Sequence, residues 1–169
     1  MNQILLTATT AAHKAGDIIH SFFHSKFEVK MKGKGNPVTE ADIAADDIIK
    51  KILTTEFPDY GWLSEETRDT PDRLSKKRVW VVDPIDGTKE FVEGIPNFVV
   101  SIGLVENGIP ILGVIHNPIN KDTYSATLGG GTLFNGKQTI INDKTEFSQI
   151  SMLNSRSETR QGLWEPYIP

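Results

Sequence analysis

Apolar residues near the amino end recur every three or four positions, which is the pattern of a helix with one buried face. The first such segment runs from Gln3 to about Phe23. A second follows Thr39, which is the predicted N-cap, with Asp42 at the third helical position, where its carboxylate can complete a capping box. Pro58 ends this segment. The chain is therefore predicted to begin with two amphipathic helices.

Beyond the second helix the apolar positions alternate or form short runs, as in β-strands. Asn-Gly pairs at 107–108 and 135–136 predict hairpin turns, and residues 89–91 predict a short helical turn. The predicted strands are Tyr60–Leu63, Val79–Val82, Phe98–Val105, Ile109–His116, Asp122–Leu128 and Ser148–Leu153. This order predicts an α+β fold in which two amino-terminal helices pack on a mostly antiparallel sheet.

Three polar segments have competing interpretations. The basic stretch Lys30–Gly35 is predicted to be a solvated loop, with phosphate steering as the alternative. Gly129–Gly131 favours a hairpin over a phosphate cradle, because no lysine followed by serine or threonine comes after it. His13, His20 and His24 have no carboxylate at metal-ligand spacing and are predicted to lie at the surface or its boundary.

Composition limits the classes of function. The 169 residues suit one domain, and 38% apolar with 24% charged residues is typical of a folded globular protein. The absence of cysteine excludes disulfides, thiolate zinc sites and cysteine nucleophiles. A net charge of -4 argues against a nucleic-acid polymer as partner. No apolar run reaches the roughly 18 residues of a membrane span and no signal sequence is evident, so we expect a cytoplasmic protein.

The most informative motif is DPIDGT, Asp83 to Thr88, which follows the apolar run Val79–Val82. Two aspartates at the end of a buried strand are unfavourable unless a cation pairs with them. Glu65, after the preceding strand, adds a third carboxylate, although the Glu65–Glu66 pair alone is more typical of a solvated loop. Carboxylates, waters and phosphate oxygens are what Mg²⁺ prefers. The motif predicts a divalent cation beside a phosphate, as in phosphate ester hydrolysis.

Three segments resemble the inositol monophosphatase superfamily of magnesium-dependent, lithium-sensitive phosphomonoesterases. They are GNPVTEAD (Gly35 to Asp42), LSEE (Leu63 to Glu66) and WVVDPIDGTKEF (Trp80 to Phe91), in this order. The serine before the two glutamates, the KEF after DGT and the later SRSE at Ser155 to Glu158 are more similar to the 3'(2'),5'-bisphosphate nucleotidase branch. The resemblance implies the layered sugar-phosphatase fold and a small phosphorylated metabolite as substrate.

The resemblance also implies a metal site. Glu65, Asp83 and the backbone carbonyl of Ile85 would bind a first Mg²⁺, and Asp83 and Asp86 would share a second, in a complete family site of two or three ions. Glu66 would support the catalytic centre from beside Glu65.

Catalytic and substrate contacts are implied as well. The Thr88 hydroxyl, held by Asp42, would orient or help deprotonate the attacking water, which reacts in line without a covalent enzyme intermediate. Glu65, the amides of Gly87 and Thr88, and Lys32 match the family's substrate contacts, and helix-start amides suit a phosphate oxygen.

The chain departs from the family pattern at its carboxyl end. Family members continue for about 100 residues, a small domain's worth, and that half carries a WDxAAG-type motif whose aspartate completes the second metal site. Here the only aspartate after Asp122 is Asp143. Residues 1–169 are therefore expected to be one amino-terminal α+β domain that ends before the carboxy-terminal α/β half. A truncated gene product, an incomplete polypeptide and a shortened protein completed by a partner are all open.

This departure has a consequence for the surface of the protein. An uncovered face of the sheet would be apolar and would favour a homodimer or aggregation.

The leading function implied by the resemblance is magnesium-dependent hydrolysis of 3'-phosphoadenosine 5'-phosphate to AMP and phosphate. Inositol monophosphatase activity and a non-catalytic, metal-binding remnant are the alternatives.

Overall fold

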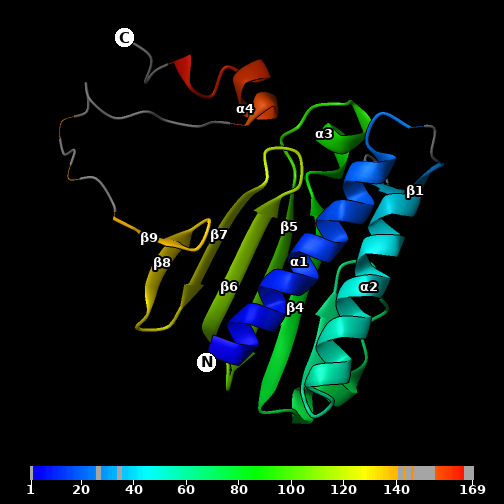
Figure 1. The fold of residues 1–169 in the computed structure, drawn as a ribbon. Helices are drawn as coiled ribbons and strands as arrows, with labels where there is room; N and C mark the ends of the chain where they lie inside the picture. Colours follow the sequence, from blue (N-terminus) through cyan, green and yellow to red (C-terminus); the bar gives the residue numbers. More distant parts are fainter. Residues whose placement is uncertain are drawn as a thin grey trace. The chain divides into compact units, whose positions relative to one another are not determined.

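Two long helices and a seven-stranded sheet dominate the fold of the first 139 residues (Figure 1). The structure, a computed structural model, describes residues 2–25, 28–33, 36–140, 143, 146 and 155–165, without the side chains of residues 32, 33 and 36. The chain divides into two units, Met1–Thr139 and Ile140–Pro169, which are described separately.

The elements of the first unit confirm the predicted order of helices and strands. They are α1 (Asn2–Phe22), β1 (Val29–Gly33), β2 (Asn36–Thr39), α2 (Glu40–Glu56), β3 (Gly61–Ser64), the 3-10 helix η1 (Pro71–Ser75), β4 (Arg78–Asp86), α3 (Thr88–Val92), β5 (Val99–Glu106), β6 (Ile109–Asn117), β7 (Asp122–Thr127), β8 (Gly131–Phe134) and β9 (Lys137–Thr139).

The large sheet has the strand order β3-β4-β5-β6-β7-β8-β9. Strand β3 runs parallel to β4, and every other neighbouring pair is antiparallel. The α+β class and the mostly antiparallel sheet are thus confirmed. The single parallel pair matters for function because parallel strands end at the same edge of a sheet.

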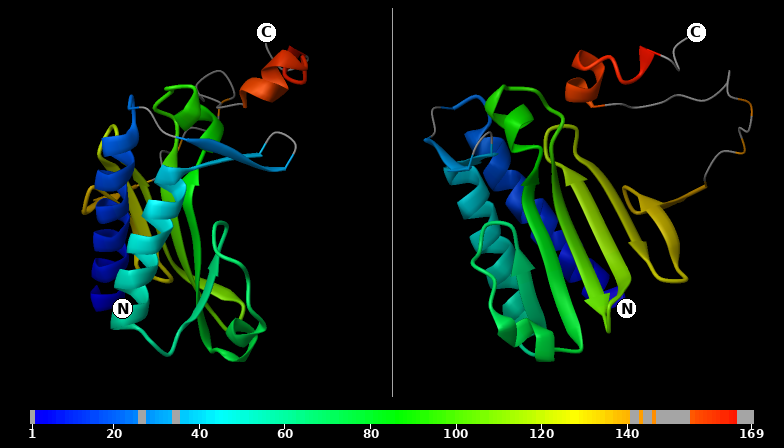
Figure 2. Two further views of the ribbon diagram at one scale, coloured as in Figure 1. Left: turned by 90° about the vertical axis from the view of Figure 1, so that its right-hand side faces the viewer. Right: turned by 180° about the vertical axis from the view of Figure 1, so that it is seen from behind.

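Helices α1 and α2 lie side by side on one face of this sheet (Figures 1 and 2). Their buried residues are mostly alanine and isoleucine, and they share one core with Trp80 of β4 and with apolar residues of β5 and β6. Gly16 lets α1 approach β6 closely. A Cβ atom there would lie 2.7 Å from the ring of His116. The core therefore sits between the helices and the sheet.

The opposite face of the sheet carries apolar side chains that remain exposed. Val81 is 39% exposed, and Ile115 and Tyr124, which are paired in register, are 46% and 48% exposed. The view from behind in Figure 2 shows this face of β4 to β7 without α1 or α2 across it. The predicted apolar surface is present among these strands.

One predicted loop is wrong. Residues 30–33 of the basic stretch Lys30–Gly35 belong to β1, which pairs with β2 in an antiparallel hairpin in which Lys30 faces Val38 and Met31 faces Pro37. The alternation of lysine with other residues is a period-two pattern, and pairing with β2 extends the backbone. Residues 34–35 lie outside the described part of the chain, as does the predicted strand Ser148–Leu153.

The second unit contains α4 (Arg156–Arg160). The Ser155 hydroxyl accepts a hydrogen bond from the Glu158 amide at 3.1 Å, and the Ser155 amide donates to the Glu158 carboxylate at 3.3 Å. The Trp164 indole donates to the same carboxylate at 3.2 Å. The SRSE segment thus forms a capping box. Among the described helices of the chain, none combines the length and the apolar character of a membrane span.

Candidate metal and phosphate site

The acidic residues of the candidate site meet because β3 and β4 are parallel and in register. Ser64 pairs with Val82, so the next residues along the two strands, Glu65 and Asp83, leave the same edge of the sheet. The Glu65 amide continues the ladder by donating to the Val82 carbonyl at 3.2 Å. Two motifs that are far apart in the sequence are thereby placed next to each other.

The DPIDGT motif contains an irregularity in the strand that turns its second aspartate. Asp83 pairs with Ser101 and Asp86 with Val99, so β4 has one residue more than β5 across this interval. Such a bulge bends a strand and re-aims its side chains. The Ile85 side chain is 2% exposed within the core. Asp83 and Asp86 are therefore separated by two buried residues, Pro84 and Ile85, yet remain at the same edge of the sheet.

A cavity of ≈ 210 Å³ lies at this edge. Its lining contains acidic residues from two strand ends, the start of α3 and a residue of β2. The lining residues are Pro37, Glu65, Asp83, Ile85, Asp86, Gly87, Thr88, Lys89 and Glu90. The structure thus brings together Glu65, Asp83, Ile85, Asp86, Gly87 and Thr88 from the predicted set.

The electrostatics of this cavity favour a cation. Burial, followed by the neighbouring Glu65 and Asp86 carboxylates, raises the pKa of Asp83 to about 7. A hydrogen bond between the Glu65 and Asp83 side chains acts in the same direction. Carboxylates that approach one another without a counter-charge hold protons more tightly. A divalent cation would replace that proton and remove the repulsion.

The oxygen atoms of this cavity are of the kind that Mg²⁺ binds. As the side chains stand, no three acidic or histidine residues in the described chain form a ready metal-binding group. The Glu65 and Asp86 side chains are exposed, and exposed side chains change rotamer rapidly. Hard oxygen atoms in a shared cavity are what Mg²⁺ binds, usually with several waters. The cavity therefore has suitable ligands, and the residues' roles as ligands stay predictions.

Asp42 joins the start of α2 to the start of α3. Its Oδ2 atom accepts hydrogen bonds from the Thr39 amide at 2.7 Å and the Thr39 hydroxyl at 2.5 Å. Its Oδ1 atom accepts from the Thr88 hydroxyl at 3.2 Å. Burial raises the pKa of Asp42, while the hydrogen bonds from Thr39 and Thr88 oppose that shift. One oxygen thus serves the predicted helix cap, and the other holds Thr88.

Gly87 fixes the turn between β4 and α3. Its φ is +105°, in the left-handed region that favours glycine. An added Cβ atom would lie 2.9 Å from the Asn97 carbonyl oxygen. The following hydroxyl, on Thr88, donates to the Ile85 carbonyl at 3.0 Å. The glycine therefore allows the tight turn that brings Thr88 back toward Asp42 and Ile85.

The two other predicted site residues are Glu66 and Lys32. Glu66 follows Glu65, and its amide donates to the Ser64 hydroxyl at 3.3 Å. Glu66 is not among the residues that line the ≈ 210 Å³ cavity. Lys32 lies in β1, and its side chain is outside the described part of the structure.

Sequence reasoning missed Asp46, a second buried carboxylate of α2. Only 4% of the residue is exposed. Its Oδ1 atom accepts a hydrogen bond from the Ser64 hydroxyl at 2.5 Å, and its Oδ2 atom accepts from the Thr67 hydroxyl. The signal in the sequence is its spacing from Asp42, because residues four positions apart lie on the same face of a helix.

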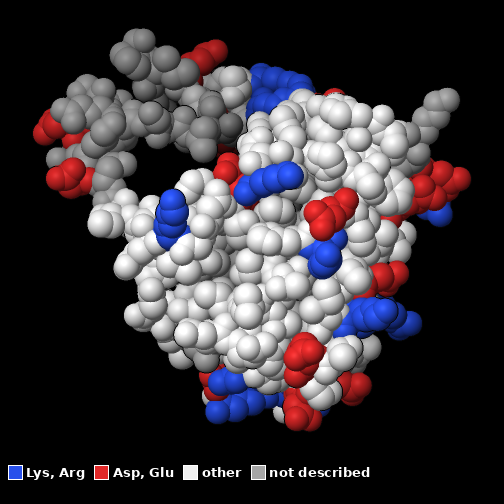
Figure 3. Space-filling model, viewed as in Figure 1, with Lys and Arg blue, Asp and Glu red and all other residues white. Residues whose placement is uncertain are grey.

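A larger groove of ≈ 1000 Å³ lies elsewhere, between α1 and the strands β6 to β8. Figure 3 shows few charged side chains around the amino-terminal part of α1 and the neighbouring strands. Asp17 and Lys121 are the charged residues in its lining. The groove therefore lacks the clustered carboxylates that phosphate chemistry with a metal needs, and the smaller cavity remains the candidate site.

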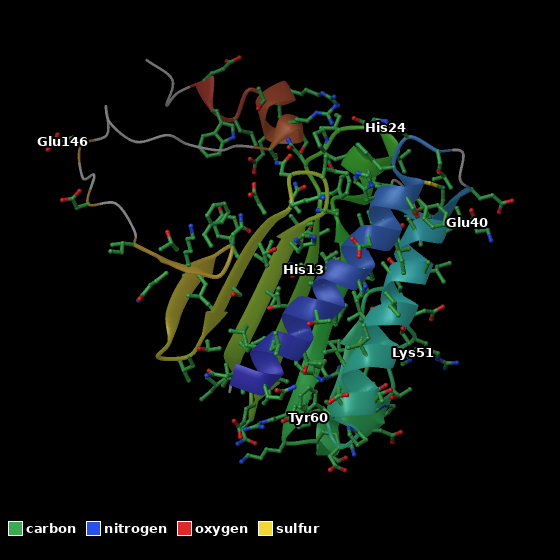
Figure 4. The ribbon with its side chains drawn as sticks, in the orientation of Figure 1. His13, His24, Glu40, Lys51, Tyr60 and Glu146 are labelled. Atoms are coloured by element: carbon green, nitrogen blue, oxygen red, sulfur yellow. The ribbon has the colours of Figure 1, made fainter. Side chains whose placement is uncertain are left out.

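The histidines of α1 are exposed residues, as predicted. Figure 4 shows His13 at the middle of α1. Its Nε2 atom lies 2.9 Å from the Thr123 hydroxyl, and that hydroxyl lies 2.9 Å from Nδ1 of the buried His116. His13 thus also connects α1 to β6 and β7, which the sequence did not indicate.

Comparisons with known proteins show which family the chain resembles. A family model described as "Inositol monophosphatase family" matches residues 1–166. Inositol monophosphatase 1 of Solanum lycopersicum is 35% identical over 165 residues, which are 96% of this chain and 60% of that protein. The 3'(2'),5'-bisphosphate nucleotidase CysQ of Haemophilus influenzae is 37% identical over 134 residues, which are 78% of this chain and 48% of that protein.

A solved structure confirms the fold predicted from the resemblance. The extragenic suppressor protein suhB from Bartonella henselae superposes with a TM-score of 0.80 at 33% sequence identity. The match covers 84% of this chain and 55% of that one. The chain thus spans about half to 60% of the length of these relatives. From the match of the family model over nearly the whole sequence, we conclude that the chain belongs to the inositol monophosphatase family.

Proposed function

We propose that the protein contributes the metal and phosphate site of a magnesium-dependent phosphomonoesterase. The observation that carries this proposal is that Glu65, Asp83 and Asp86 line one cavity, in which partial burial and the neighbouring carboxylates raise the pKa of Asp83 to about 7. These residues share a cavity with Thr88. Clustered carboxylates with a strongly perturbed pKa in a cavity are typical of functional sites. Membership of the inositol monophosphatase family supports the same reaction class.

Four groups of this chain would hold Mg²⁺: the side chains of Glu65, Asp83 and Asp86 and the carbonyl of Ile85. When bound, Mg²⁺ would neutralise charge on the phosphoryl group and acidify an attacking water. The chain's own contribution is to keep the carboxylates together at the strand ends. Glu66 would support the site from the position next to Glu65.

Thr88 and Asp42 would orient the water and take up its proton. The Thr88 hydroxyl has a single hydrogen, which it donates toward Asp42 Oδ1 or the Ile85 carbonyl. Its lone pairs remain able to accept a hydrogen bond from a water in the cavity. Because burial raises the pKa of Asp42, that carboxylate has an increased proton affinity. The pair is thereby suited to general-base assistance.

The substrate's phosphate would be held by backbone and cationic groups. Gly87 and Thr88 lie at the start of α3, where the amides have no preceding helical carbonyl to donate to. We assign these amides and Lys32 to phosphate binding, with Glu65 at the boundary between metal and substrate.

We propose 3'-phosphoadenosine 5'-phosphate as the first substrate to test. This choice is supported by the serine of LSEE, by the KEF after DGT and by the 37% sequence identity with the Haemophilus influenzae nucleotidase. An inositol monophosphate is the second candidate, because the Solanum lycopersicum inositol monophosphatase aligns with 96% of the chain.

Phosphate release tests the proposal directly. The 169-residue chain and a longer polypeptide that contains it are each incubated with both substrates, with Mg²⁺ or with a chelator. Magnesium-dependent release from either substrate is the expected result, and the faster substrate identifies the branch. Metal binding without release by either polypeptide would support the non-catalytic alternative. The proposal would be overturned if both polypeptides failed to bind the metal and failed to release phosphate.

A further inference from the structure

The loop that carries Glu65 and Glu66 is anchored on both sides of the glutamate pair. The residue before the pair, Ser64, and the residue after it, Thr67, both donate hydroxyl hydrogen bonds to Asp46. These contacts join residues 18 and 21 positions apart. The Glu66 amide in turn donates to the Ser64 hydroxyl. One carboxylate of α2 thus holds both ends of the segment that presents Glu65.

The burial of Asp46 makes this arrangement specific. A buried carboxylate is strongly unfavourable unless donors compensate it, and Asp46 is only 4% exposed. Each of its oxygen atoms is met by a different hydroxyl, at 2.5 Å for the Ser64 donor. Hydrogen bonds to a charged acceptor are stronger than neutral ones. These hydrogen bonds therefore hold Ser64 and Thr67 firmly in the positions that they occupy.

Asp46 repeats the arrangement of Asp42 one helical turn later. Asp42 holds Thr88, which follows β4, and Asp46 holds Ser64 and Thr67, which flank the end of β3. Positions four residues apart face the same way on a helix. Helix α2 thus presents two buried carboxylates to the two segments that supply the candidate metal ligands.

We propose that Asp46 is a positioning residue of the divalent-cation site, acting on Glu65 and Glu66 through the Ser64 and Thr67 hydroxyls. The inference rests on the proposed function, since it assigns Glu65 to the cation. Groups that orient metal ligands without touching the metal commonly change metal affinity by about 10–100-fold when they are replaced. Asp46 would therefore set the affinity of the site for the cation, in addition to stabilising the fold.

The decisive variant is Asp46→Asn, with Asp47→Asn as its matched control. Asp47 is the next residue of α2, is exposed and undergoes the same change of charge. Asparagine can accept one of the two hydroxyls but presents an NH₂ group to the other. Mn²⁺ is the probe, and its binding to the 169-residue chain is followed by electron paramagnetic resonance at a temperature at which circular dichroism shows each variant folded.

We expect Asp46→Asn to bind Mn²⁺ about 10–100-fold more weakly, whereas Asp47→Asn stays close to wild type. Amide hydrogen exchange of residues 65–68, measured in chelator, should become faster in Asp46→Asn but not in Asp47→Asn. This second readout reports loop order directly, and loss of overall stability would instead accelerate exchange throughout the chain.

Thr67→Val gives a test that does not alter the buried carboxylate. It removes one hydroxyl, so it should weaken Mn²⁺ binding in the same direction but less. It should add little in an Asp46→Asn background, because contacting residues are not additive. If Asp46→Asn fails to fold, Thr67→Val alone decides the matter, since unchanged affinity and unchanged exchange of residues 65–68 would overturn the inference.

Asp83→Asn separates this inference from the proposed function. Weak binding by Asp83→Asn together with wild-type affinity in Asp46→Asn would overturn the positioning role and leave the proposed cation site standing. Absence of Mn²⁺ binding by the wild-type chain would overturn both.

Discussion

The Thr88 hydroxyl donates to Asp42 Oδ1 at 3.2 Å, although the two residues are 46 positions apart in the sequence. Asp42 is 0% exposed, and its other oxygen completes the capping box of α2. The helix cap fixes the carboxylate, and the carboxylate and the Ile85 carbonyl together hold the hydroxyl. A structural element that stabilises α2 therefore also determines where Thr88 points in the cavity.

This relationship predicts different effects for its two members. Thr88→Val should lower magnesium-dependent phosphate release by about 10²–10⁴-fold, the usual range for general acid–base groups. Asp42→Asn should lower the rate and also destabilise the fold by about 1 kcal/mol, because it perturbs the cap. Thr54→Val on α2 is the control. A Thr88→Val enzyme as fast as wild type would exclude Thr88 from the reaction.

The carboxylate cluster predicts opposite effects on activity and stability. Asp83→Asn and Glu65→Gln should abolish magnesium-dependent turnover with the fold intact. Asp83→Asn should also raise the melting temperature in chelator, because asparagine resembles the protonated acid and removes repulsion from the neighbouring carboxylates. Asp47→Asn and Glu56→Gln, both on exposed residues of α2, are the controls.

Calorimetry in chelator and a phosphate-release assay measure the two effects of the cluster. An Asp83→Asn protein that melts below wild type while keeping its turnover would contradict both expectations.

Replacing Gly87 should destabilise the fold, and Gly94 offers a matched control. Gly87→Ala places a Cβ atom 2.9 Å from the Asn97 carbonyl oxygen in a left-handed backbone. Gly94→Ala also has a left-handed backbone, at φ +72°, but nothing lies within 4 Å of its Cβ atom. Strain alone costs about 1–2 kcal/mol, so Gly87→Ala should be clearly the more destabilised in urea unfolding. Equal losses would show that the turn tolerates a side chain.

The buried His116 should make the fold less stable in acid. Burial, and then the charge of His13, lower its pKa to about 4, against the smaller opposing influence of Asp122 and Asp17. The unfolded chain therefore binds more protons than the folded chain between about pH 4 and 6.5. His116 consequently destabilises the fold as the pH falls through that range, by at most about 3 kcal/mol.

Urea unfolding at several pH values measures the contribution of His116. The wild type should lose more stability between pH 7 and pH 4 than His116→Gln does, whereas His20→Gln, on the exposed side of α1, should follow the wild type. Parallel curves for the wild type and His116→Gln would contradict the prediction.

Most of the secondary structure could be predicted from the sequence because its signals are local. The alanine and isoleucine repeat of α1, the cap at Thr39 and the Asn-Gly turns depend on neighbouring residues only. Residues 30–33 form a strand instead of the predicted loop because β1 forms by pairing with β2. A short, polar strand has weak local preference, so its partner decides its conformation.

The acidic motifs were identifiable from the sequence, but their meeting was not. DPIDGT stands out by composition, because carboxylates at the end of a buried strand need compensation. What places Glu65 beside Asp83 is the parallel register of β3 and β4. The contacts of Asp46 do not follow from the sequence, because its partners, Ser64 and Thr67, are brought to α2 by the same packing.

The sequence by itself determined the helices, most strands and the residue types of the candidate cation site, since these follow from periodicity, capping and side-chain chemistry. Only the tertiary structure decided which carboxylates share a cavity, which oxygen of Asp42 holds Thr88, and that Asp46 anchors the Glu65 loop. The physical reason is that hydrogen bonds and carboxylate repulsion act over a few ångströms in space, and strand register and helix packing set those distances.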